Sequence, residues 1–140
     1  MTAPTPPSPA LNALADRASG AGLSAAPYVR SEHYASAVFE SVKAVVNRVK
    51  SMTGLDSDGV PLMNQAFSVQ NPRLVLGGAG TTTERNMQAG YRELFVGAVQ
   101  AIRNTSAHEP LGVMEVNEAF ELLGLASLLM RLLDGAAPSS

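Results

Sequence analysis

The chain has 140 residues, of which 46% are hydrophobic and 16% charged, as expected of one domain that can bury its own core. Its net charge of −2 excludes a generally basic nucleic-acid-binding protein, because affinity for phosphate comes from clustered lysine and arginine. The lack of cysteine excludes disulfides, thiolate chemistry and zinc fingers.

The first residues, MTAPTPPSPA, are rich in Pro, Ser and Thr, and we expect them to be disordered. They have neither the basic nor the apolar region of a signal peptide. The longest apolar stretch, LLGLASLLM, is shorter than the roughly 20 residues that span a bilayer. We therefore expect a cytoplasmic protein without membrane attachment. It should comprise a disordered or weakly helical segment (1–29), a helical domain (30–136) and a tail (137–140).

The first long helix is predicted from about residue 31 to residue 52, with Ser31 as its cap. Apolar residues recur every three or four positions, as they do on one face of an α-helix: Tyr34, Val38, Val42, Val45, Val49 and Met52. Thr53 and Gly54 predict its end. A loop (LDSDGV), a short helical piece near LMNQAF and an irregular stretch (NPRLVLGGAG) follow.

The second long helix is predicted to begin with a capping box. Thr81 can accept a hydrogen bond from the amide of Glu84, whose side chain reaches back to the amide of Thr81. The helical period then continues to Arg103. Gly90 and Gly97 lie on roughly one face, and each costs up to about 1 kcal/mol relative to alanine. We therefore expect a close neighbour on that face.

A third long helix is predicted over residues 116–133. From Leu122 onward it is apolar nearly all round, which indicates burial on more than one side and suggests a subunit interface. Together these patterns predict an all-α fold, a small helical bundle packed as a two-fold dimer.

Two charged residues with four between them, Arg103 and His108, stand at the exit of the second helix. Arg103 falls in the last turn, where a cation complements the helix dipole, and Asn104 tolerates the left-handed conformation of a helix end. His108 lies in the exit loop, a kind of surface where function concentrates. The spacing occurs by chance in many proteins, so the spacing alone favours an ordinary helix end.

The wider sequence strengthens the functional interpretation. An Arg-x4-His motif with a polar residue after the arginine, at a helix exit in a helical domain, resembles the motif of the HEPN superfamily. More closely, the chain resembles the Ymh family of bacterial and phage proteins, which is related to HEPN. Thr105 stands where that family usually has proline. The similar stretches follow in the expected order: HYASAVFESVKAVVNRV, TGLDSDGVPLMNQAF, GYRELFVGAVQAIRN followed by AH, and LLGLASLLMRLLD.

The resemblance implies a metal-independent endoribonuclease without a cofactor, which acts as a homodimer whose two motifs meet at the interface. The RNA 2′-hydroxyl would attack its own phosphate, giving a 2′,3′-cyclic phosphate and a 5′-hydroxyl end. His108 can serve as base or acid near neutral pH, and Arg103 can grip two phosphate oxygens. The resemblance further implies a role in phage defence, as a toxin or in stress response, with an antitoxin or defence-system partner.

Asn104 is the third predicted catalytic residue, and it could bind phosphate or orient His108, or could simply end the helix. Two secondary candidates, His33 and Glu109, also have two interpretations each. Glu109 could hold the imidazole or be an exposed acid. His33 could reach a polar site or be solvated. Three basic residues on the first helix form either a solvated face or an RNA track: Lys43, Arg48 and Lys50.

Two other functions remain open on the sequence. The same fold could be a non-catalytic HEPN-like module that binds RNA or a protein, or a purely structural dimer. A metal site is not predicted, because two distant histidines without cysteine make no convincing set of transition-metal ligands.

Overall fold

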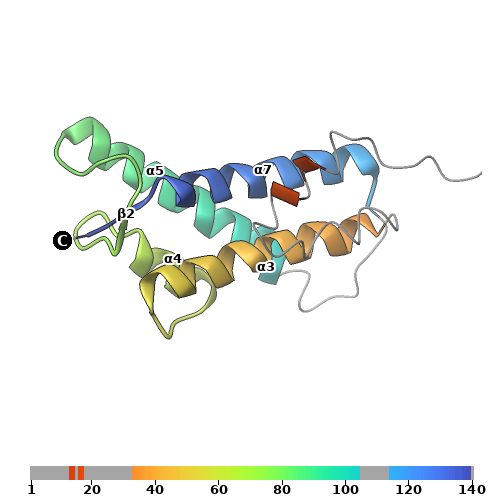
Figure 1. Cartoon of the computed structure of the whole chain (residues 1–140), viewed down its shortest axis with the longest axis horizontal. Coiled ribbons are helices and arrows are strands. Elements are labelled where there is room, and N and C mark those ends of the chain that lie inside the picture. Colours follow the sequence, from red (N-terminus) through yellow and green to blue (C-terminus); the bar gives the residue numbers. More distant parts are fainter. Residues whose placement is uncertain (1–12, 15, 18–32, 105–113, 140) are drawn as a thin grey trace, which may run out of the picture.

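The computed structural model describes residues 13–14, 16–17, 33–104 and 114–139, and these confirm a small all-α bundle. Figure 1 shows two long helices, α3 and α7, side by side, with α5 running obliquely back between them. The helical elements are α3 (Tyr34–Thr53), α4 (Gly59–Ala66), α5 (Thr82–Ala98), the π-helical turn η2 (Val99–Asn104) and α7 (Val116–Asp134). Two short strands, β1 (Leu74–Val75) and β2 (Ala137–Pro138), pair antiparallel.

Helix α3 buries the predicted valine face. Val38, Val42, Val45 and Val49 are almost fully buried, whereas Met52 at the end of the stripe is 38% exposed. The first half of the face packs with the start of α7, and the second half packs with α4, α5 and the end of α7. The helix therefore forms one side of a continuous core.

The two ends of α3 differ in how they are capped. His33 occupies the N-cap position and makes no side-chain cap hydrogen bond, and the predicted cap, Ser31, lies outside the described residues. At the other end Gly54 adopts φ +70°, and its amide donates to the carbonyl of Lys50. Thr53 and Gly54 thus end the helix as predicted, because glycine adopts the left-handed conformation without steric cost.

The capping box of α5 is confirmed. The Glu84 amide donates to Thr81 Oγ1 and the Thr81 amide donates to Glu84 Oε1, both at 3.1 Å. The helical chain continues past Arg103 to Asn104 and Arg103 lies in its last turn, as predicted, but the chain passes from the α-helix α5 into the π-helix η2 at Val99. The spacing of the apolar residues does not distinguish an α-helix from a π-helix here, because burial of Ala98, Val99 and Ile102 is compatible with both.

The described chain supplies no close neighbour to Gly90 and Gly97. A Cβ atom added at either glycine would meet open space. Both glycines are exposed, as are Met87 and Leu94 on the same stripe, with exposed fractions of 42% and 41%. This face of α5 points away from the core of the described chain.

Helix α7 is buried along one broad face, which includes Leu123, Ala126 and Leu129. The sequence predicts burial of this helix on more than one side. Phe120 and Leu128 remain 44% and 42% exposed, so the described chain by itself does not provide that burial. The subunit interface expected on this helix stays a prediction.

A buried amide organises the irregular segment between α4 and α5. Gln88 Nε2 donates to the carbonyls of Phe67 and Leu74, and Gln88 Oε1 accepts from the amide of Leu76 at 2.8 Å. The rings of Phe67 and Phe95 stack beside it with centroids 4.3 Å apart. These contacts replace the hydrogen bonds that a regular element would supply.

Strand β2 consists of residues that the sequence assigned to the tail. Ala137 and Pro138 pair with Val75 and Leu74, and the Ser139 amide donates to the carbonyl of Arg73. The pairing attaches the chain beyond α7 to the segment that Gln88 holds. In the N-terminal segment, residues 13–14 and 16–17 are helical, and the expected disorder of residues 1–10 lies outside the described residues.

Candidate functional site

Arg103, near the end of η2, makes a bidentate ion pair with Asp58. Its Nη1 donates to Asp58 Oδ1 at 2.9 Å and its Nη2 donates to Oδ2 at 3.3 Å. The side chain of Arg103 is 23% exposed and that of Asp58 is 51% exposed. Two parallel hydrogen bonds between ions are stronger and more directional than one, so the guanidinium has a defined orientation at the surface.

Asp58 is held by two further contacts. It is the N-cap of α4, and its Oδ1 accepts from the amide of Gly59 at 2.8 Å. Lys50, in the last turn of α3, places Nζ 3.3 Å from the same oxygen. One carboxylate therefore joins the end of α3, the start of α4 and the end of η2.

These contacts lower the pKa of Asp58 to about 2 from 3.8. The hydrogen bonds from Arg103 are the main cause, partial burial opposes the shift, and the Gly59 amide and Lys50 add to it. The carboxylate is therefore ionised at neutral pH.

The ion pair predicts a pH-dependent difference in stability between the wild type and Asp58→Asn. A carboxylate with a lowered pKa stabilises the fold above its unfolded pKa of about 4, and this contribution is lost as the pH falls through about 2. The difference in free energy of unfolding, measured by urea denaturation, should be constant at neutral pH and shrink over this acidic window. We expect at most about 1 kcal/mol, because the pair is exposed. A difference that stays constant down to about pH 2 would contradict the contribution of the ionised pair.

The other predicted motif residues lie partly outside the described chain. His108 and Glu109 fall within residues 105–113, which the structure does not describe, and the same holds for the side chain of Asn104. The structure therefore does not test whether Arg103 and His108 meet. Of the predicted catalytic residues, Arg103 is the one whose side chain has described contacts.

His33 lies far from this ion pair. It is at the N-cap of α3, whereas Lys50 is in the last turn of the same helix. At 1.5 Å per residue the two are about 25 Å apart along the helix axis. Within one chain, the structure does not bring His33 together with Arg103.

The basic residues of α3 do not form one continuous track. Arg48 Nη2 is 2.7 Å from Asp134 Oδ1, and its Nη1 donates to the carbonyl of Met130 at 3.2 Å, so this side chain ties α3 to the end of α7. Lys50 is paired with Asp58, and Lys43 is exposed. Two of the three predicted RNA-binding residues are thus engaged by carboxylates of the chain.

Asp58 is the site residue that sequence reasoning missed. The sequence predicts a loop over LDSDGV, although an Asp directly before a helical piece is an N-cap signal. That signal could have located the cap. The local sequence gives no signal for its ion pair with Arg103, which lies 45 positions later.

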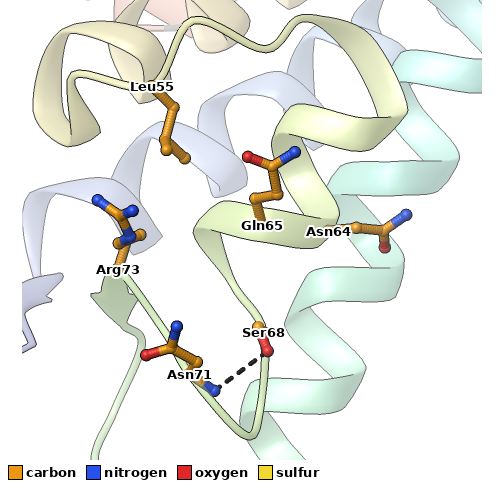
Figure 2. A pocket seen from close by; sticks show the side chains of 6 residues that line it. All are labelled: Leu55, Asn64, Gln65, Ser68, Asn71 and Arg73. Atoms are coloured by element: carbon orange, nitrogen blue, oxygen red, sulfur yellow. Dashed lines mark hydrogen bonds between the residues drawn. The ribbon is translucent and has the colours of Figure 1, made fainter.

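A separate polar pocket of about 300 Å³ lies beside α4, and none of the predicted site residues lines it. Figure 2 shows Arg73 and Asn71 on one side of it and Gln65 of α4 on the other. The full lining is Leu55, Asn64, Gln65, Ser68, Asn71 and Arg73. Most of these side chains are exposed, so the pocket is an open hollow that carries no arrangement of reactive groups.

Among the described residues, no helix is long and apolar enough to cross a membrane. In the same part of the chain, no three His, Asp or Glu side chains come together in a group that could hold a metal ion.

Residues 24–133 match a family model described as "Protein of unknown function (Hypoth_ymh)". Neither the curated proteins nor the solved structures gave a significant match.

Proposed function

Because this chain belongs to the Ymh family, whose function is unknown, its activity has to be inferred from its own residues, and we propose that it is a metal-independent endoribonuclease of HEPN type. It would cleave RNA through attack of the 2′-hydroxyl on the adjacent phosphate. A new P–O2′ bond forms, the P–O5′ bond breaks, and the products are a 2′,3′-cyclic phosphate and a 5′-hydroxyl.

The observation that best supports this proposal is the fixed guanidinium of Arg103. Asp58 holds it by two hydrogen bonds at the end of η2, directly before the segment that carries His108. Arginine stays charged at every relevant pH and suits the planar recognition of phosphate oxygens. An oriented cation of this kind can stabilise the charge that develops on the phosphorane.

His108 would supply the proton transfers. One imidazole can take the proton from the 2′-hydroxyl, and a second, protonated imidazole can give one to the leaving 5′-oxygen. A single chain has one such histidine in the motif, so the proposal includes a homodimer in which two motifs form one site. A two-fold axis makes that arrangement natural, because each subunit presents the same surface.

The biological setting that we propose follows from the resemblance to HEPN proteins. RNA cleavage would arrest growth in phage defence, as a toxin or under stress, and an antitoxin or defence-system partner would restrain it.

A second candidate is a non-catalytic dimerisation module that binds RNA or protein. One observation favours it: exposed apolar side chains on α5 and α7, namely Met87, Leu94, Phe120 and Leu128, offer area for contact with another chain. In that case the Asp58–Arg103 pair would be a structural link between α4 and η2.

The decisive experiment incubates the purified protein with an end-labelled single-stranded RNA, with and without EDTA. We expect cleavage at equal rates in both samples, because arginine and histidine carry the chemistry. A matched RNA with 2′-deoxyribose at the cleaved positions should stay intact, since it lacks the nucleophile.

The outcomes separate the candidates. Loss of cleavage in EDTA would contradict the metal-independent mechanism, and absence of cleavage together with RNA binding would favour the binding module. Sedimentation measures the oligomeric state in the same buffer. An active monomer would contradict the composite site.

A further inference from the structure

Asp58 makes contacts that exceed the needs of a helix cap. Its Oδ1 accepts from the Gly59 amide, and both of its oxygens engage Arg103. We propose that Asp58 is a positioning residue, which holds one edge of the Arg103 guanidinium so that the other edge can bind the RNA phosphate. This inference rests on the proposed function and adds a residue to its site.

Asp58 occupies one edge of the guanidinium. Asp58 engages Nη1 and Nη2, the two terminal nitrogens. A guanidinium has five N–H groups, and Nε–H with one outer N–H forms another pair that matches two phosphate oxygens. Within the described parts of the chain, the hydrogen bonds and ion pairs found for Arg103 are those with Asp58. One arginine can therefore bind a carboxylate and a phosphate together.

Asp58 is itself anchored without Arg103, as a positioning residue must be. The Gly59 amide fixes Oδ1 at the start of α4, and Lys50 approaches the same oxygen from α3. Because the Gly59 backbone amide and the Lys50 side chain set the place of the carboxylate, the carboxylate can set the place of the guanidinium. Arginine otherwise has about 2 kcal/mol of side-chain rotational entropy to lose on binding a ligand.

The charges of this cluster suit a phosphate. One carboxylate faces two cations, Lys50 and Arg103, so the cluster keeps one net positive charge after the ion pairs form. Stability alone does not account for the arrangement, since exposed ion pairs contribute between 0 and about 1 kcal/mol. Orientation of a group before the reaction has a larger effect on rate, because a misplacement of about 1 Å can lower it about 100-fold.

The test is a double-mutant cycle in the RNA-cleavage assay. Asp58→Asn is expected to lower kcat about 10- to 100-fold, with KM for RNA unchanged or lower because the variant has one negative charge fewer. In the Arg103→Ala background the same change should have no further effect, because Asp58 acts through Arg103. Asp56→Asn, an exposed aspartate in the same loop, is the matched control and should keep the wild-type kcat.

A merely structural Asp58 would behave differently. In that case Asp58→Asn would lower the melting temperature and leave kcat unchanged at temperatures where the variant is folded. Unchanged kcat in Asp58→Asn, or additive losses in the double variant, would overturn the proposal. Tighter RNA binding with unchanged kcat would overturn it as well, because Asp58 would then shield Arg103 from RNA. Asp58→Glu keeps the charge and should recover part of the rate.

A second measurement does not depend on cleavage. The ¹⁵Nε–¹Hε NMR signal of Arg103, assigned by its loss in Arg103→Ala, should be distinct in the wild type and move among the signals of solvated arginines in Asp58→Asn. It should shift further when a 2′-deoxy oligonucleotide is added to the wild type. If the wild type does not cut RNA, the proposed function fails, while this spectrum still decides whether Asp58 orients Arg103 toward a phosphate. No shift on either change would overturn the inference.

Discussion

Replacing Arg103 by alanine is expected to lower the rate of RNA cleavage on the order of 10²–10³-fold. The guanidinium is the oriented cation of the proposed site, and its removal leaves the charge that develops on the phosphorane without a nearby partner. The loss should appear in kcat, because this charge is greatest in the transition state. Single-turnover cleavage of a labelled RNA by purified protein measures it.

The matched control for this variant is Arg85→Ala. Arg85 lies in the first turn of α5, is exposed, and its side chain donates a hydrogen bond to Thr82 Oγ1 at 3.3 Å within the same turn. Its removal changes the net charge by the same amount and should leave the cleavage rate near that of the wild type. Circular dichroism would establish that both variants are folded. A fully active Arg103→Ala protein would refute the assignment of this residue.

Replacing His108 by alanine is expected to lower the cleavage rate by about 10²–10⁴-fold, the usual range for loss of a general acid or base. Imidazole is the one group of the proposed site that can change its protonation near neutral pH. The variant should still bind RNA, because Arg103 and its carboxylate partner remain. Cleavage and filter binding on the same preparation separate the two effects.

The chain has two histidines, so His33→Ala is the natural comparison. His33 lies at the N-cap of α3, far along that helix from the Asp58–Arg103 pair, and its removal should cost much less activity. If His33→Ala were the inactive variant and His108→Ala the active one, the site would have to be placed at the start of α3.

Local signals in the sequence predicted much of the fold. The valine stripe of α3, the left-handed Gly54 and the Thr81–Glu84 capping box each involve residues within one or two helical turns. Interactions over such distances depend on spacing, which can be read directly from the order of residues. The predicted all-α bundle follows from these elements.

The site could be predicted only in part. Arg103 stood out because it ends a periodic segment, but its partner comes from another helix, and α3, α4 and η2 must pack before the two meet. The same is true of Arg48, which seemed available for RNA until α7 brought Asp134 beside it. The sequence also did not show that the Gly90 face is exposed within the chain, because a glycine in a helix is compatible with both close packing and open space. Such features depend on tertiary structure.

The buried side chain of Gln88 has a consequence for how the molecule opens. The Leu76 amide lies outside any helix or strand, but it donates a buried hydrogen bond to Gln88 Oε1. It can therefore exchange its hydrogen with water only when this hydrogen bond breaks. Gln88 also holds the carbonyls of Phe67 and Leu74. The segment from residue 67 to residue 76 and the first turns of α5 should therefore open and close as one cooperative unit.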